Sequence, residues 1–223
     1  MSLSKTFVDQ LEELVNSGDY EKAIILIDSK LNLELDIESK SYLWALKGKT
    51  LSMQAYGTKT EGIRITVDDP PKVSYNYQLI QQAITCFDKS IDLKPDNMFA
   101  YENKGLSLAR KGDFKDAIKC AIAALDINPK NTTVLVNLSK WYKDISLFNE
   151  SISYADKAIQ CGNMATKEML IAAYINKGIA QFNLGQQDYE KSLESAIEIT
   201  SNPEMKKLNE QILEDAKRKF ILR

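Results

Sequence analysis

The sequence predicts an all-α fold of about five stacked helical hairpins that ends in a capping helix. Two stretches, Tyr101 to Pro129 and Leu135 to Asn163, align with each other at a shift of 34 residues. Equivalent residues recur at this shift as Asn103 and Asn137, Phe114 and Phe148, Ile118 and Ile152, and Ala124 and Ala158. A repeat of this length is typical of an array in which each hairpin needs its neighbours to bury its apolar face.

The residues inside the period indicate a family. The unit over residues 98–131 contains Tyr101, Gly105, Leu108, Gly112-Asp113-Phe114, Ala117, Ala121, Ala124 and Pro129. This pattern of aromatic, small and closing proline residues resembles the tetratricopeptide (TPR) signature. The resemblance implies a right-handed α-solenoid with a single array of repeats over residues 4–37, 41–96, 98–131, 132–163 and 171–202, and a capping helix over 203–221.

The other units carry the signature less completely. The second has Trp44, Gly48, Leu51, Ala83, Phe87 and Pro95; the first has Phe7, Leu11, Gly18-Asp19-Tyr20 and Ala23; the fifth has Tyr174, Gly178 and Tyr189. The turn of the fifth unit has extra residues, and its second helix lacks the last core alanine. Together the units cover nearly the whole chain.

Small and turn-forming residues in these units have structural explanations. Glycine at the eighth position and alanine at the twentieth allow two helices to approach closely. In the Gly-Asp turns, glycine suits a left-handed helix end, and Asp19 or Asp113 can accept from free amides at the next helix start. Pro95 and Pro129 are expected to end second helices.

An insertion over residues 56–76 separates the two helices of the second unit. The first helix is expected to end near Ala55 and the second to begin near Tyr77, whereas a TPR turn needs only a few residues. Residues 63–67 alternate like a strand and 73–77 are β-prone, so a hairpin and an extended helix followed by an ordered loop are both open. The segment is either a binding loop or a tolerated insertion.

Composition argues against several function classes. Net charge is −2, with acids and bases interleaved, which disfavours nucleic acid as a partner. Histidine is absent from the sequence, and Cys86, Cys120 and Cys161 are widely separated, so we expect no metal site, no cofactor and no enzyme activity. No apolar run is long enough to cross a bilayer, which predicts no membrane insertion and a cytoplasmic protein.

The resemblance implies that the first helices of the repeats line a concave groove. Steps of three and four residues place positions two, five, six, nine and twelve of each repeat on one helix face. The partner-binding residues predicted on this basis are Tyr42, Lys49, Phe99, Glu102, Asn103, Val136, Asn137, Lys140, Lys143, Ile175, Asn176, Ile179 and Phe182.

Position six is asparagine in three consecutive repeats, at Asn103, Asn137 and Asn176. An amide side chain can donate and accept, as a peptide backbone requires, so these residues either form a peptide-holding ladder or reflect family background. The positions that hold a terminal carboxylate in chaperone-tail binders lack the required basic residues here, which disfavours that role.

The sequence thus predicts a non-enzymatic module that binds a peptide or helix of a partner protein in the groove. A self-assembling scaffold, with the groove or terminal helix binding a second copy, is the main alternative. A carrier of an apolar ligand at the Ile175, Ile179 and Phe182 end is a further alternative. The last helix, with Asn202 as its cap and Pro203 at its first position, is expected to cover the end of the array, with a partner-binding helix as the alternative. Some of the apolar groove residues could instead be covered by this helix.

Overall fold

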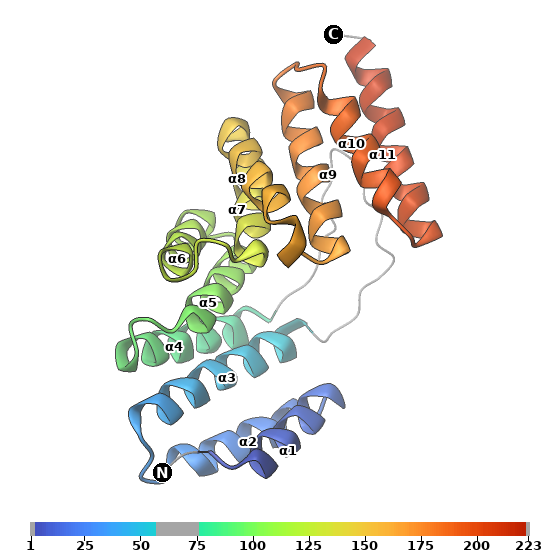
Figure 1. The fold of residues 1–223 in the computed structure, drawn as a ribbon. Helices are drawn as coiled ribbons and strands as arrows, with labels where there is room; N and C mark the ends of the chain where they lie inside the picture. Colours follow the sequence, from blue (N-terminus) through green and yellow to red (C-terminus); the bar gives the residue numbers. More distant parts are fainter. Residues whose placement is uncertain (1–2, 57–75, 222–223) are drawn as a thin grey trace. The chain divides into compact units, whose positions relative to one another are not determined.

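A computed structural model describes residues 3–56 and 76–221, and all regular structure in these two ranges is helical. The helices pair into five successive hairpins followed by a single helix, which confirms the predicted fold class (Figure 1). Their bounds are α1 Lys5–Asn16, α2 Tyr20–Leu31, α3 Ile37–Tyr56, α4 Tyr77–Leu93, α5 Met98–Lys111, α6 Phe114–Ile127, α7 Thr132–Asp144, α8 Phe148–Gln160, the 3-10 turn η1 Gly162–Met164, α9 Lys167–Asn183, α10 Tyr189–Ile199 and α11 Pro203–Ile221.

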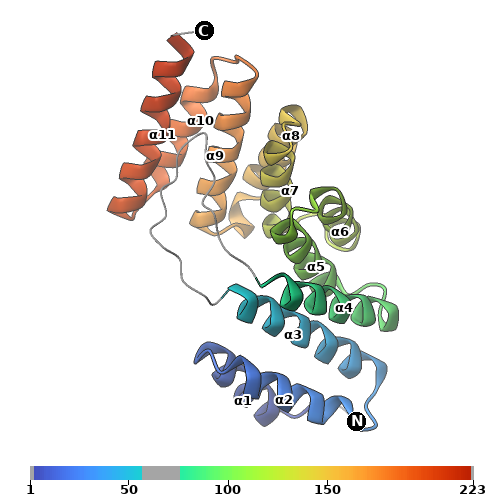
Figure 2. The ribbon, with the colours of Figure 1, turned by 180° about the vertical axis from the view of Figure 1, so that it is seen from behind.

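The described helices form two units. The first contains α1 to α6 and the second contains α7 to α11. Within the first unit, α3 packs against both α2 and α4, and α5 packs against α4 and α6 (Figures 1 and 2). Within the second unit, α9 packs against α7, α8 and α10. Each hairpin therefore buries its apolar face against the next one in its unit, as the repeat predicts.

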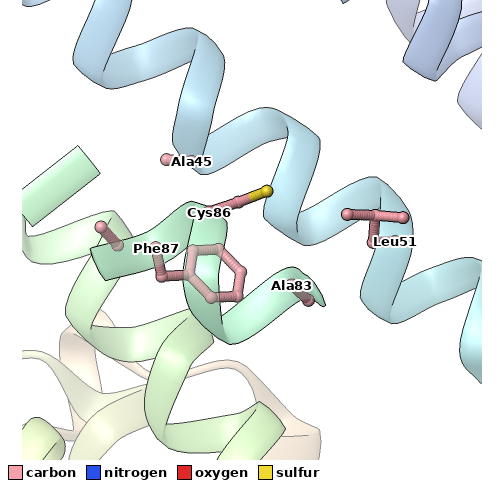
Figure 3. Close-up of a cluster of buried hydrophobic side chains, with 6 residues drawn as sticks. Ala45, Leu51, Ala83, Cys86 and Phe87 are labelled. Atoms are coloured by element: carbon pink, nitrogen blue, oxygen red, sulfur yellow. The ribbon is translucent and has the colours of Figure 1, made fainter. Parts of the chain in front are cut away.

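The contact between α3 and α4 shows why the second repeat needs a glycine. Figure 3 shows Phe87 and Cys86 on α4 beside Ala45 and Leu51 on α3, in a cluster that also includes Ala83 and Ala100. A Cβ atom added to Gly48 would lie 2.7 Å from Cε1 of the fully buried Phe87 ring. The two helices can approach this closely because position eight carries no side chain.

One core cluster of the second unit lies between α9, α10 and α11. Its buried residues are Phe182, Tyr189, Leu193, Ile212, Leu213 and Ala216, with Phe220 packed against them. Asn202 Oδ1 accepts from the amides of Glu204 and Met205 at 3.0 Å each, and Pro203 is the first helical residue. The last helix is therefore capped as predicted, and its apolar stripe packs against the end of this unit.

Three of the helix–helix turns contain a glycine in the left-handed conformation. Gly18, Gly112 and Gly185 have φ of 81°, 91° and 71°, which confirms the left-handed turns predicted at Gly18 and Gly112. The predicted cap at Asp19 is wrong, because its carboxylate makes no cap bond and instead lies 2.9 Å from Nζ of Lys22. Helices α4 and α6 end at Leu93 and Ile127, shortly before Pro95 and Pro129.

The two helices of the second hairpin end and begin where the sequence predicts. Helix α3 ends at Tyr56 and α4 begins at Tyr77. The amide of Asn76 donates to the carbonyl oxygen of Ala55 at 3.3 Å, which brings the two helix ends together. The strand-like residues 63–67, and 73–75 of the second β-prone run, lie outside the described residues.

Candidate functional site

A pocket of about 250 Å³ lies among the first helices α1, α3 and α5 of the first unit. Its walls are mostly apolar, with polar side chains among them. The lining residues are Val8, Leu11, Glu12, Val15 and Asn16 from α1, Tyr42, Leu46, Lys49 and Thr50 from α3, and Phe99 from α5. Three separate repeats thus contribute to one recess.

The pocket walls are held by the core beneath them. Phe7, Leu11, Ala23, Ile27 and Leu43 form a buried cluster, against which Val8, Val15 and Leu46 pack. Helix α1 begins at a serine cap, where Ser4 Oγ accepts from the amide of Phe7 at 3.3 Å. Val8, Leu11, Val15 and Leu46 both pack in this core and line the pocket, so the core fixes the walls that α1 and α3 supply.

Two charged side chains of opposite sign line the pocket. Lys49 Nζ lies 5.6 Å from the centroid of the Phe99 ring, within range of a cation–π interaction. Glu12 belongs to another lining helix, α1. Both residues are exposed, and neither forms an ion pair within the part of the chain that the structure describes. The pocket can therefore offer one cationic and one anionic group to a bound molecule.

Three of the residues predicted for the groove meet here. Tyr42, Lys49 and Phe99 line the pocket together, whereas Glu102 and Asn103, also on α5, are outside its lining. Asn103 Nδ2 donates to the carbonyl oxygen of Phe99 at 2.8 Å, one turn back on the same helix. One of its two amide protons is therefore used within the protein, which weakens the role predicted for this residue in a peptide ladder.

The predicted lysines of the second unit are differently placed. Lys140 and Lys143 lie on α7, and both pair with Asp144, at 3.3 Å and 3.0 Å. Val136, on the same helix, is only 9% exposed, so it belongs to the core more than to an open surface. Asn137 is half-buried and makes no side-chain hydrogen bond to any described residue.

The apolar end of the predicted groove is covered by the chain itself. Phe182 is 4% exposed, because α10 and α11 supply its neighbours Tyr189 and Phe220, with ring centroids 5.6 and 6.2 Å away. Ile179 packs against the same cluster. The assignment of Phe182 to an open groove is therefore wrong: the helix periodicity gives its face correctly, but α11 occupies that face.

Asn176 and Ile175 complete the predicted set on α9. Asn176 is 7% exposed, and Ile175 is half-buried. Helix α9 packs against α7, where Thr133 Oγ1 lies 3.8 Å from the sulfur of Met169. This face of the second unit thus contains small polar and apolar groups, and the structure places most of them in contacts between helices.

The contribution of α1 was missing from the predicted groove. The groove residues predicted from the sequence begin at the second repeat, with Tyr42. Applied to the first repeat, with Phe7 as position four, positions five, nine and twelve are Val8, Glu12 and Val15. All three line the pocket. The signal was present in the same periodicity.

The cysteine and acidic side chains of the described residues do not gather into a metal site. Cys86, Cys120 and Cys161 are free thiols, and burial raises the pKa of Cys86 to about 11. Within residues 3–56 and 76–221, no group of three or more histidine, cysteine or acidic residues is arranged to hold a metal ion. No described helix has the length and apolar character needed to cross a bilayer.

Comparison with known proteins supports the repeat assignment. A family model described as tetratricopeptide repeat matches residues 98–131, the range of the third predicted repeat. The chain is 26% identical to the human mitochondrial import receptor subunit TOM70 over 178 residues, which is 72% of this chain but 29% of that receptor. The chain thus spans less than a third of the length of this relative.

Two solved structures share the fold. MamA from Desulfovibrio magneticus RS-1 is 17% identical, with a TM-score of 0.65 over 87% of this chain and 93% of that one. YrrB, described as a TPR protein with an unusual peptide-binding site, is 14% identical, with a TM-score of 0.63 over 94% of this chain and 92% of that one. The chain therefore contains a tetratricopeptide repeat at residues 98–131, and its helical hairpins share the fold of these solved structures.

Proposed function

We propose that this chain is a non-enzymatic interaction module that holds a segment of a partner protein against the first helices of its first unit. The observation that carries the proposal is the pocket between α1, α3 and α5, where three successive first helices contribute side chains to one recess. Its mixture of apolar walls and a few polar groups is typical of surfaces that anchor peptides.

The size of the pocket favours one protein side chain as its occupant. Sites for drug-sized molecules measure roughly 300–1,000 Å³. The pocket here measures about 250 Å³, below that range. A bulky apolar side chain presented by a peptide or a helix fits such a recess, and the neighbouring backbone would lie across Tyr42 and Lys49.

The burial of Phe182 argues against a carrier of an apolar ligand. That alternative placed the ligand at Ile175, Ile179 and Phe182. Because Phe182 and Ile179 already pack against α10 and α11, this end offers a hydrophobic core and not an open apolar surface. A cytoplasmic location remains a prediction, which fractionation of the source cells would check.

A selection from a random-peptide phage library against the full chain tests the proposal. Tyr42 is 40% exposed and lines the pocket, so Tyr42→Ala changes the site with little expected loss of stability. Tyr77 is 57% exposed, lies at the start of α4 and is not part of the pocket lining, so Tyr77→Ala is the matched control.

We expect peptides enriched by the wild-type chain to bind Tyr77→Ala normally and to bind Tyr42→Ala at least several-fold more weakly. Failure to enrich any peptide, or equal binding to the two variants, would contradict the proposal. Assembly of the chain with itself, the main alternative, would instead appear in light scattering as a mass that rises with protein concentration.

A further inference from the structure

Building on the proposed function, we propose that the pocket selects a bulky apolar side chain flanked by an acidic residue on one side and a basic residue on the other. The acid would meet Lys49 on α3 and the base would meet Glu12 on α1. The partner is thus a protein segment in which the apolar side chain that enters the pocket has an acidic residue on one side and a basic residue on the other.

Lys49 is the cation available for the acidic group. Its ammonium lies over the Phe99 ring, so the chain already directs it along the pocket wall. Lys47, two residues earlier, is held by Asp28 at 2.6 Å. Lys49 is exposed and forms no ion pair within the described residues. A carboxylate from a bound protein would therefore form an ion pair with Lys49 without displacing another group.

The part of the lining that α1 supplies is acidic. Helix α1 contains three acids, Asp9, Glu12 and Glu13, and a single base, Lys5. Glu12 lines the pocket, whereas the other two acids are outside its lining. Glu12 and Lys49 do not pair with each other, so each remains available, and a bound segment would experience a negative wall on α1 and a positive one on α3.

The other predicted groove lysines differ in this respect. Lys140 and Lys143 are both paired with Asp144 on their own helix. A partner acid would have to compete with Asp144 there, whereas at Lys49 it would gain a new pair. Of the three predicted groove lysines, Lys49 is therefore the one that we expect to bind the acidic group of the partner.

Charge-reversed variants of the full chain test this inference. The probes are synthetic fluorescein-labelled peptides taken from the wild-type selection, each with a version in which the acid flanking the anchor is replaced by lysine. We expect Lys49→Glu to weaken the acidic peptides by about fivefold and to improve binding of their lysine versions. Glu12→Lys should act in the reverse sense on the basic flank.

The matched control is Lys22→Glu. Lys22 is exposed on α2 of the same unit and does not line the pocket, so its reversal changes net charge equally. Equal weakening by Lys22→Glu and Lys49→Glu would reduce the effect to net charge and overturn the inference. The inference would also be overturned if Tyr42→Ala lowered the affinity of the peptides while Lys49→Glu left it unchanged. That result would leave the proposed function intact.

Discussion

Lys47 Nζ on α3 lies 2.6 Å from Oδ1 of Asp28 on α2, and the pair joins the second helix of one repeat to the first helix of the next. The same relationship recurs between Lys104 and Asp88 and between Lys177 and Asp156. Each lysine stands immediately before the eighth-position residue, Gly48, Gly105 or Gly178, of its repeat. This ion pair is therefore a repeated contact between neighbouring hairpins.

The pair between Asp28 and Lys47 should contribute modestly to stability. A double-mutant cycle with Asp28→Asn and Lys47→Met is expected to give a coupling energy of about 0.5–1 kcal/mol, because Lys47 is partly buried. The coupling should fall as salt is added. The pair between Asp116 and Lys119 on one exposed helix turn is the control, and its coupling should be smaller. Equal couplings would contradict a special role between repeats.

Replacing Ser146 by glycine should stabilise the folded protein. Its φ is 62°, and it occupies the place that Gly112 has one period earlier. Both turns have the same two backbone hydrogen bonds. The amide of Ser146 donates to the carbonyl of Lys143 and the amide of Leu147 to that of Tyr142, as Gly112 and Asp113 donate to Ala109 and Leu108. Because a left-handed conformation is unfavourable for a residue with a Cβ, Ser146→Gly should raise the free energy of unfolding by about 0.5–1 kcal/mol.

The reciprocal change, Gly112→Ser, should lower the free energy of unfolding by a similar amount. Urea denaturation followed by circular dichroism measures both variants. If Ser146→Gly proved neutral or destabilising while Gly112→Ser was harmless, the left-handed turn would not be the source of strain at Ser146.

Cys86 should react slowly with thiol reagents. Burial raises the pKa of its thiol to about 11, with nearby lysines acting in the opposite direction. At pH 8 the thiolate that attacks iodoacetamide is therefore scarce at Cys86, and we expect Cys161, which is only half-buried, to be alkylated first. Peptide mass mapping after brief alkylation gives the order, and preferential labelling of Cys86 would contradict this account.

The same pKa has a consequence for stability. Because the folded thiol keeps its proton to a higher pH than the unfolded one, its contribution is fully present below about pH 9. The contribution should be lost as pH rises toward about 11. Cys86→Ala should therefore show a shallower loss of stability over this window than the wild-type chain.

Replacement of residues 57–75 by a short Gly-Asp turn should preserve the helices. The ends of α3 and α4 already meet through the bond from the Asn76 amide to the Ala55 carbonyl, so a short connection can span them. Loop-closure entropy changes slowly with length. We expect unchanged helicity and a cooperative melt by circular dichroism, and a collapsed transition would show that the segment supports the fold.

The fold could be predicted from the sequence because its signature residues have structural roles. Gly48 is required where Phe87 approaches, and Gly112 is favoured where φ is positive, so both residues mark helix contacts and turns directly. The cap at Asp19 could not be predicted in the same way. Its carboxylate had two available partners, the helix amides and Lys22, and composition does not decide between them.

The site could be predicted only in part. Periodicity correctly brought Tyr42, Lys49 and Phe99 to one surface, and it would have included Val8, Glu12 and Val15 had it been applied to the first repeat. It left open whether solvent or the last helix lies against Phe182, since a helix face looks the same in both cases, and the structure places α11 there. The Asp144 that neutralises Lys140 was visible four residues along the same helix.

Hydrogen exchange with and without a library-selected peptide tests the central claim most directly. We predict that saturating peptide slows amide exchange in α1, α3 and the start of α5, the helices that line the pocket, and that Tyr42→Ala removes this protection while Tyr77→Ala keeps it. Protection confined to α9, α10 and α11, or the same protection in both variants, would contradict binding at the pocket between α1, α3 and α5.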